Sequence, residues 1–300
     1  MTEQKIVPNI WCNGNAAEVV DFYVSAFPDS EILGRTRYPT EGLADFQQGM
    51  AGEDMVIDFS LGGVRLTAIN AGPEFVPTPM LSFLVNFDPS RDDGAPQRLD
   101  QLWQRLAEGG TVLMELGEYG FSKRYGWVRD RYGVSWQLIL TDPAGEPRPF
   151  LVPALMFANA NVNRAEEAVE FYTSVFPDSR IGTLARYPQA QGEVREGALM
   201  FGEFAVGEEW FAAMDSPVPH EFDFNEGISL LVECDDQAEV DYFWEKLSRV
   251  PEAEQCGWCK DQFGVSWQVV PGGMEELIDK PGNFAAMMKM KKIVLAEFSR

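Results

Sequence analysis

The sequence predicts an α+β fold in which the order strand, helix, strand, strand, strand occurs in four modules, two in each half of the chain. Motifs of the first half return in the second, and apolar spacing switches between the strand period of two and the helix period near 3.6. The recurring segments are 22–23, 27–30, 37–39 and 125–138, which return at 171–172, 176–179, 186–188 and 256–269. A period this long indicates duplicated domains rather than a solenoid.

The first repeat contains two modules. Asn15 is followed by Glu18 at the spacing of a capping box, which predicts the start of the first helix, and Phe27-Pro28 predicts its end. The first module has predicted strands at 5–12, 31–38, 55–61 and 64–70. The second has a strand at 81–87, a helix at 96–108, a strand at 111–116 and two strands within 125–138.

The second repeat follows the same plan, with Asn163 and Glu166 at the capping spacing. Its predicted strands cover 154–157, 180–187, 197–201, 208–213, 228–234, 255–260 and 266–270, and its second helix covers 237–248. We expect domain 1 at 1–141, a linker rich in Pro and Gly at 142–151, domain 2 at 152–273 and a C-terminal tail at 274–300. Apolar residues between 285 and 293 predict a tail helix on the domain surface.

The block at 125–138 predicts two short strands joined by a tight turn, in which Asp130 is a turn residue. After the turn, Ser135 and Gln137 point to one side of the strand and Trp136 to the other. We expect the tryptophan on a helix-covered face, so that the glutamine side is free to line a concavity. The copy at 256–269 repeats this alternation.

Composition excludes several function classes. The chain has 300 residues and a formal net charge of −23, which disfavours binding to nucleic acids and to anionic membrane surfaces. No apolar run is long enough to span a bilayer, and the N-terminus lacks the apolar core of a signal peptide. Four cysteines in a chain of this length do not form a disulfide framework. We expect a soluble cytoplasmic protein whose partner is a small molecule.

Several motifs together carry a family resemblance. They are Gly14-Asn15-Ala16-Ala17-Glu18, the segments 22–23 and 27–30, the Tyr-Gly-Trp and Gly-Val-Ser-Trp-Gln block, Phe224-Asn225-Glu226, 254–258 and 288–292. The chain resembles two fused PhnB-like domains of the vicinal oxygen chelate superfamily, whose members include glyoxalases, bleomycin-resistance proteins and extradiol dioxygenases. The resemblance implies paired modules that curl into cups with helices outside, and a fused tandem that acts as a covalent pseudo-dimer, with a further homodimer open. Members often carry the label 3-demethylubiquinone-9 3-methyltransferase.

The resemblance also implies a divalent metal held by His and Glu, and the residues argue against it. The chain has one histidine. Where metal-binding relatives place a glutamate on the last strand, this chain has Gln137 and Gln268, and a neutral amide is a poor ligand for such an ion. The other ligand positions hold Pro8-Asn9, Pro153-Ala154, Ser82 and Ser229. We therefore expect no metal and no other cofactor.

Two further motifs have alternative interpretations. His220 is either a general base oriented by Glu221 or Asp215, or a loop histidine that satisfies backbone groups. Cys256-Gly257-Trp258-Cys259 has the spacing of a redox motif, but such a motif belongs at a helix N-terminus and this one lies in a predicted strand. The methyltransferase label is doubtful, because the turn after the first strand holds one glycine and resembles a helix cap, not a nucleotide cradle.

Three functional hypotheses follow. The protein is a metal-independent binder or enzyme for an aromatic or quinone-like metabolite, an enzyme such as a lyase, isomerase or transferase with His220 as its base, or a sequestering protein without chemistry. Methyl transfer to a ubiquinone precursor, as the family label suggests, is a further alternative. The residues expected to line one cup are Trp11, Asn70, Ser82, Tyr125, Ser135 and Gln137, and those expected to line the other are Asp215, His220, Asn225, Ser229, Cys256, Ser266 and Gln268.

Overall fold

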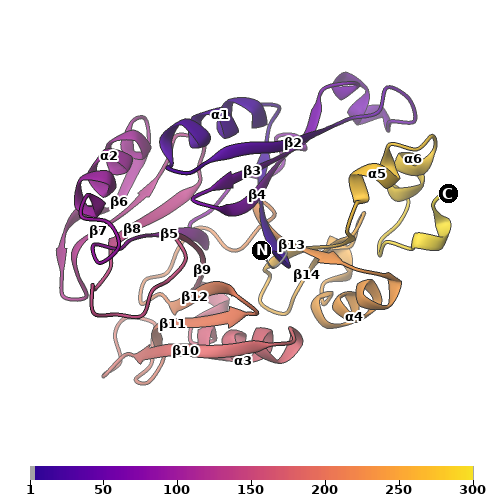
Figure 1. Cartoon of the computed structure of the whole chain (residues 1–300). Helices are drawn as coiled ribbons and strands as arrows, with labels where there is room; N and C mark the ends of the chain where they lie inside the picture. The colour runs from indigo at the N-terminus through magenta and orange to yellow at the C-terminus, as the bar shows by residue number, and fades with distance from the viewer. Residues whose placement is uncertain (1–3, 300) are drawn as a thin grey trace.

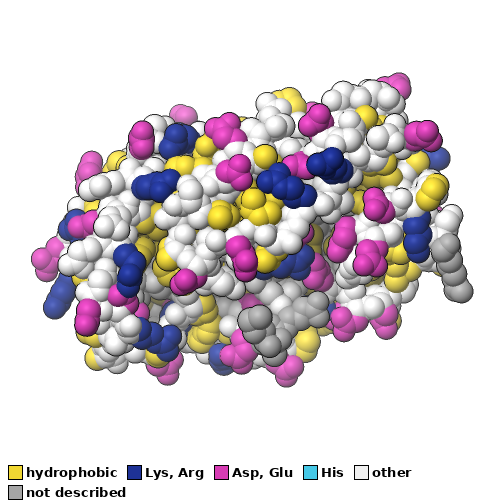
Figure 2. All heavy atoms as spheres, turned by 45° about the horizontal axis from the view of Figure 1, so that its top comes forward, with side chains coloured by type: hydrophobic (Ala, Val, Ile, Leu, Met, Phe, Trp, Pro, Cys, Tyr) yellow, Lys and Arg dark blue, Asp and Glu magenta, His cyan; other side chains and the backbone are white. Residues whose placement is uncertain are grey.

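Two mixed β-sheets, covered by helices on their outer faces, form the protein (Figure 1). The computed structural model describes residues 4–299. Within that range no helix has the length and apolar character needed to cross a membrane. On the face drawn in Figure 2, acidic and basic side chains are interspersed, so the negative charge is not gathered in one patch there. The predicted α+β class is confirmed.

The first sheet has seven strands in the order β14-β15-β13-β1-β4-β3-β2. The first module supplies β1 (Ile6–Cys12), α1 (Ala16–Ala26), β2 (Glu31–Arg37), β3 (Asp54–Leu61) and β4 (Val64–Asn70). The fourth module supplies β13 (Ile228–Cys234), α4 (Gln237–Leu247), β14 (Trp258–Lys260) and β15 (Ser266–Pro271). Strands β1 and β13 join the two modules in antiparallel pairing.

The second sheet has eight strands in the order β10-β11-β12-β9-β5-β8-β7-β6. The second module supplies β5 (Leu81–Phe87), α2 (Ala95–Ala107), β6 (Thr111–Tyr119), β7 (Ser122–Arg129) and β8 (Ser135–Leu140). The third supplies β9 (Leu151–Phe157), α3 (Ala165–Val175), β10 (Ser179–Arg186), β11 (Leu199–Val206) and β12 (Glu209–Asp215). Here β5 and β9 make the antiparallel junction.

Each sheet therefore takes one module from each sequence repeat, a pairing that the sequence left open. The predicted domain boundaries describe the repeat in the sequence, whereas the sheets are assembled across them. The fourth module has three strands instead of four. Between its helix and its last strand, the second module has the two long strands β6 and β7. The fourth module has in their place only the short 3₁₀ helix η3 (Pro251–Ala253) and the three-residue strand β14.

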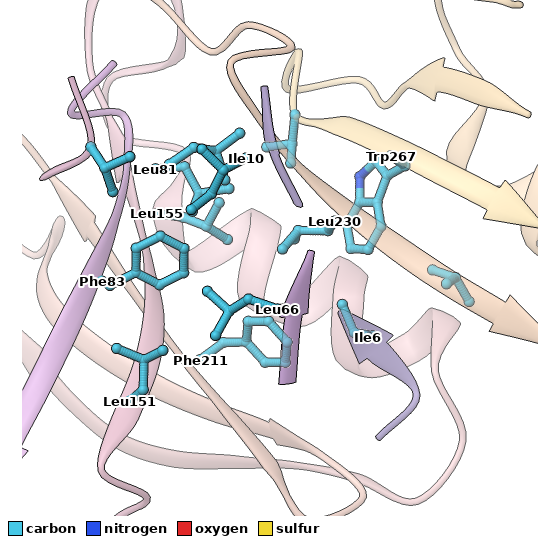
Figure 3. Close-up of a cluster of buried hydrophobic side chains, with 14 of the residues drawn as sticks. Ile6, Ile10, Leu66, Leu81, Phe83, Leu151, Leu155, Phe211, Leu230 and Trp267 are labelled. Carbon is cyan, nitrogen blue, oxygen red and sulfur yellow. The ribbon is translucent and has the colours of Figure 1, made fainter. Parts of the chain in front are cut away.

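The core lies between the sheets and their helices. Alternate strand residues face it, and they include the labelled side chains Ile6, Ile10, Leu66, Leu81 and Phe83 in Figure 3. Trp136 and Trp267 are almost fully buried there, which places the glutamines of β8 and β15 on the opposite face. The predicted orientation of the duplicated block is confirmed.

A buried carboxylate ties the two modules of each repeat together, although these modules lie in different sheets. Asp130, in the turn after β7, accepts hydrogen bonds from the Tyr23 hydroxyl of α1 at 2.7 Å and from the Trp136 indole at 2.8 Å. Its other oxygen accepts the backbone N–H groups of Tyr132 and Val134. The predicted turn residue thus also joins helix α1 of the first sheet to the second sheet.

The second repeat contains the same arrangement. Asp261 accepts the Tyr172 hydroxyl at 2.7 Å, the Trp267 indole at 2.8 Å and two backbone N–H groups. Burial raises the pKa of Asp261 to about 6, against the opposing effect of these four donors. Because α3 belongs to the second sheet and Asp261 to the first, this contact crosses between the sheets in the opposite direction.

The helix starts differ from the capping-box prediction. Asn15 precedes α1 but makes no side-chain cap, and α3 begins after Arg164, one residue beyond Asn163. The first helical N–H groups are instead bonded by strand side chains: Ala16 N donates to Asn70 Oδ1 at 2.9 Å, and Ala165 N donates to Asp215 Oδ1 at 3.2 Å. The chain brings a better-placed acceptor from a neighbouring strand, which the local sequence does not reveal.

The C-terminal tail also differs from prediction. It forms two short helices, α5 (Met274–Ile278) and α6 (Asn283–Met287), joined by a turn, instead of one helix at 285–293. Gly282 adopts a left-handed conformation (φ +83°) immediately before α6, a conformation that favours glycine. Ile278 of α5 and Phe284 of α6 pack with Tyr38, Leu43 and Met55 of the first module. The other 3₁₀ turns are Asp45–Met50, Asn159–Asn161 and Leu295–Glu297.

We predict that Tyr23→Phe and Tyr172→Phe each lower the free energy of unfolding by about 1.5–3 kcal/mol, because a buried carboxylate loses a donor. Urea denaturation followed by tryptophan fluorescence measures this loss. Tyr119→Phe is the control, since its hydroxyl donates only to an exposed local carbonyl. A Tyr23→Phe protein as stable as the control would show that this contact does not hold the modules together.

Candidate functional site

A cavity of about 530 Å³ lies on the face of the first sheet that is opposite to its helices, a face we call the first cup. Its lining comes from all seven strands of that sheet, from the 45–50 turn, from neighbouring loops and from the tail. The strands supply alternate residues to it, because the residues between them face the core. The missing fourth strand of module four leaves space at this edge, and the cavity is lined there by Glu252, Ala253, Gln255 and Cys256.

A chain of neutral polar groups crosses the floor of the first cup on four adjacent strands. The Thr67 hydroxyl on β4 donates to Asn9 Oδ1 on β1 at 2.7 Å. The Asn9 amide is 3.4 Å from Ser229 Oγ on β13, and Gln268 Nε2 on β15 donates to the same oxygen at 2.9 Å. These side chains hold one another in place across the centre of the sheet.

Gln268 retains an unused acceptor that faces the cavity. The residue is only 7 % exposed, its Nε2 is bonded to Ser229, and within residues 4–299 no donor reaches its Oε1. In the second sheet the equivalent Gln137 is satisfied, because the Tyr125 hydroxyl donates to its Oε1 at 2.7 Å. Cys256 stands at the position of Tyr125 in the first cup, so the small side chain leaves both the space and the free acceptor.

The corresponding face of the second sheet, the second cup, is different in character. Ala154 and Ala212 occupy the positions of Asn9 and Thr67, and they belong to an apolar cluster with Leu84 and Val152. Gln137 Nε2 still donates to Ser82 Oγ at 2.9 Å. The two cups share a backbone plan, but the polar floor is complete only in the first.

The linker covers one side of the second cup. Arg148 pairs with Glu203 of β11 at 3.0 Å and lies 4.1 Å from the Trp210 ring centroid. Trp210 stands where the first cup has Arg65. The predicted linker is therefore also a structural part of the second cup.

Three aromatic side chains form one wall of the first cup. Trp11 makes edge-to-face contacts with Phe75 at 5.0 Å and with Trp258 at 5.7 Å between ring centroids. Its indole N–H donates to Gly72 O at 2.7 Å, which fixes the ring. All three rings line the cavity.

The charged side chains beside this neutral floor form ion pairs. Arg65 Nε donates to Asp58 at 2.8 Å and its Nη1 donates to Glu233 at 2.8 Å. Burial raises the pKa of the Glu233 carboxyl, and the neighbouring guanidinium opposes that rise. The arginine is neutralised by two carboxylates, so it offers little attraction to an anionic ligand.

The tail closes the apolar end of the cavity. The side chains that line this end are mainly apolar, apart from the Gln47 amide beside Met288 and the Tyr38 hydroxyl, which donates to Asn70 O at 2.6 Å. They are Tyr38, Gln47, Met50, Met55, Met274, Ile278, Phe284, Met287 and Met288. Met288 Sδ is 3.7 Å from Cys256 Sγ, which fastens the tail to the wall of the cup. The methionines of the tail pack against the first module, as predicted, and they also line the cavity.

The structure redistributes the predicted lining residues. Trp11, from the first repeat, lies in one cup with Ser229, Cys256 and Gln268 of the second repeat. Ser82, Tyr125 and Gln137 are hydrogen-bonded to one another in the second cup. None of these bonds involves a residue that was predicted to line the other cup. The grouping by repeat was wrong because the modules pair across the repeats.

Several predicted residues have other positions. Asn70 and Asp215 face the helices and bond their first N–H groups. Asn225 bridges two loops, accepting from Gly227 N and donating to Val76 O. Ser135 and Ser266 are buried at the starts of their strands, and their hydroxyls have no partner among the described residues.

His220 lies in the loop after β12, outside the set of described residues that line the cavity. Its Nε2 is 3.0 Å from Ser216 Oγ, its backbone N–H donates to Asn159 Oδ1, and its ring stacks on Phe222. The Ser216 hydroxyl is also 3.0 Å from Val218 O, so this backbone carbonyl competes with His220 for its proton. Burial lowers the pKa of His220. These contacts agree with the interpretation as a loop histidine.

The redox spacing of the cysteines is not realised as a redox site. Burial raises the pKa of Cys256 to about 11, and Cys259 is buried in the core. Cys256 precedes a strand, so no helix N-terminus stabilises its thiolate.

Sequence reasoning missed a substantial part of the site. Thr67, Phe75 and the Arg65 pairs were not singled out, nor were the tail methionines as lining residues. The alternation in 64–70 could have placed Thr67 beside Asn9 once β1 and β4 were known to be neighbours. No local signal places the tail over the first cup.

The donor set does not fit the divalent metal that the superfamily uses. The positions at the centre of the first cup hold Asn9, Thr67, Ser229 and Gln268, which are neutral and bonded to one another. Divalent ions of that type are held by His, Cys and carboxylate groups. Within residues 4–299 no group of three such side chains is close enough to hold one.

Comparisons with known proteins identify relatives of each half. A family model described as 3-demethylubiquinone-9 3-methyltransferase matches residues 4–139 and again 149–270. A Bacillus cereus structure, described as a putative 3-demethylubiquinone-9 3-methyltransferase and PhnB protein, is 34% identical, with 46% of this chain and 100% of that chain covered and a TM-score of 0.39. Protein PA1353 from Pseudomonas aeruginosa is 24% identical, with 46% and 98% covered and a TM-score of 0.38.

A structure of nearly full coverage is a glyoxalase I variant from Zea mays. It is 13% identical, with 91% of this chain and 93% of that chain covered and a TM-score of 0.50. This likeness concerns the fold alone. A search of curated proteins gave no match.

We predict that Tyr125→Phe lowers the free energy of unfolding by about 1–3 kcal/mol, because Gln137 Oε1 is then buried without a donor. Tyr132→Phe is the matched control, since its hydroxyl bonds the exposed Glu18. Urea unfolding measures both. Equal stability of the two variants would mean that the tyrosine hydroxyl is not what distinguishes the second cup from the first.

Proposed function

Because the chain belongs to the family described as 3-demethylubiquinone-9 3-methyltransferase, within the vicinal oxygen chelate superfamily, we propose that it binds a small organic molecule in the first cup without a metal. The observation that carries this proposal is the 530 Å³ cavity with a free acceptor, Gln268 Oε1, at its floor. A cavity of this size with few convergent polar groups is typical of ligand sites.

The lining supports a ligand with a flat ring. Trp11, Phe75 and Trp258 offer aromatic faces and edges at one end, and methionines offer a deformable apolar surface at the other. Gln268 Oε1 would accept a hydrogen bond from a hydroxyl or N–H group on that ring. An aromatic or quinone-like metabolite satisfies these features.

Metal independence is supported by the neutral floor. Its four side chains are bonded to one another and leave Gln268 Oε1 free, so an ion would have to break these bonds to gain more than one weak neutral ligand. Beside that floor, Glu233 is held by Arg65 and is therefore not free to act as a base.

The family description names a methyltransferase, and methyl transfer to a quinone precursor is the alternative. The size and aromatic wall of the cavity are compatible with such an acceptor. The turn from β1 to α1 gives no support for a nucleoside-containing donor, because Ala16 N is already bonded to Asn70. Transfer of a labelled methyl group from S-adenosylmethionine to a demethylated quinol would establish this alternative.

The binding proposal is tested with the neutral fluorophore N-phenyl-1-naphthylamine. We expect its fluorescence to rise on binding, and Leu231→Trp or Ile69→Trp to weaken binding at least about tenfold, because the indole fills the cavity. Ile139→Trp, on the second cup, is the control and retains binding. Circular dichroism confirms that each variant is folded. An unchanged affinity in both cavity variants would overturn the assignment of the site.

Metal independence has a separate test. We expect Zn²⁺, Ni²⁺ and Mn²⁺ to leave the melting temperature and the probe affinity of the natural protein unchanged. The double variant Asn9→His, Gln268→Glu supplies two metal-type ligands on the same floor and is expected to gain a metal-dependent rise in melting temperature. A rise in the natural protein, reversed by a chelator, would refute metal independence.

A further inference from the structure

The first cup has an excess of negative charge around its neutral floor. This charge indicates the kind of ligand that the cup binds. Six carboxylate side chains line the cavity: Asp58, Glu74, Glu226, Glu233, Glu252 and Glu275. Arg65 is the one basic residue in that described lining, and it is taken by Asp58 and Glu233. With Lys260 counted beside Glu226, four negative charges remain in excess. An anionic ligand would be repelled from such a site.

Glu226 and Glu74 both lie near the aromatic wall, and Glu74 precedes Phe75 directly in the chain. The N–H of Trp11 donates to the carbonyl of Gly227, and Trp258 lies two residues before Lys260 on β14, on the same side of the strand. Lys260 pairs with Glu226 Oε1 at 3.0 Å. The other oxygen, Oε2, is buried and has no partner among the described residues. Because this oxygen has no accessible surface, a ligand in the cavity would interact with the negative charge of Glu226 and not with Oε2 directly.

The aromatic wall has no internal cation. Within residues 4–299, lysine or arginine groups lie over Phe22, Tyr132, Trp210, Tyr242, Phe243 and Phe263, but none lies over Trp11, Phe75 or Trp258. Rings arranged beside a carboxylate form a favourable environment for an ammonium group, because the ring faces carry negative potential. The free Oε1 of Gln268 adds another acceptor that faces the cavity.

From these observations we infer that the first cup selects an organic cation, an amine or quaternary ammonium compound with an apolar part. The cationic group lies against Trp11, Phe75 and Trp258 beside Glu226, and the apolar part extends toward the methionines of the tail. This inference rests on the proposed function, because it specifies the class of molecule that the same cavity binds.

The test compares two ligands of equal shape. One is phenethyltrimethylammonium, and the other is its neutral isostere, in which a carbon replaces the nitrogen. Isothermal titration calorimetry at low and high salt measures both affinities. We expect the cation to bind about tenfold more tightly than the isostere, and the difference to shrink with salt. Equal or tighter binding of the isostere would overturn the cation proposal, while leaving the small-molecule site intact.

Two variants assign the preference to its residues. Glu226→Gln and Trp11→Leu are each expected to weaken binding of the cation about three- to tenfold, with Glu226→Gln leaving the isostere unaffected. Glu203→Gln, which removes a carboxylate from the second cup, is the control and changes neither affinity. A preference for the cation that persists in both cavity variants would refute these residues as its source. If neither ligand nor the neutral naphthylamine binds, the proposed function itself fails.

Discussion

The architecture depends on two buried carboxylates, Asp130 and Asp261, each of which accepts a tyrosine hydroxyl, a tryptophan indole and two backbone N–H groups. Each carboxylate stabilises its own β-turn and also accepts a hydrogen bond from a tyrosine on a helix that packs on the other sheet. Since the two modules of each repeat lie in different sheets, these contacts link the two sheets in addition to the continuous apolar core. Four donors on a carboxylate offset much of the cost of burying its charge, which explains why the same residues occur in both repeats.

Duplication gave two cups with one backbone plan, and side-chain substitutions made them different. In the second cup, alanines replace the asparagine and threonine of the floor, a tyrosine satisfies the glutamine, and Arg148 of the linker covers one side. In the first cup, a shorter fourth module and the small Cys256 leave space that the tail roofs over. Two polar acceptors, Gln268 Oε1 and Glu226 Oε2, have no donor there among residues 4–299. The division suits a chain in which one cup stabilises the fold and the other receives a ligand.

Much of the fold followed from the sequence because its signals are local or repeated. Strands 64–70, 81–87 and 228–234 have the predicted bounds, since alternation of apolar residues is a direct consequence of strand geometry. The orientation of Gln137 against Trp136 followed in the same way. Less of the site could be predicted. Asn70 and Asp215 were expected to line the cups and instead bond helix N–H groups, a role set by the neighbouring helix and not by their own strands.

The sequence by itself determined the four modules, the face on which each strand residue lies and the neutral side chains that replace metal ligands. Only the tertiary structure decided which modules share a sheet, and therefore that Trp11 and Gln268, from opposite ends of the chain, line one cavity. It also decided that the tail closes the first cup. The physical reason is the distance along the chain over which each signal acts. Periodicity and turn chemistry act over a few residues, whereas sheet pairing and cavity lining join residues more than two hundred positions apart. The strand at the edge of one module could pair with the edge strand of several others, so the sequence does not specify the partner.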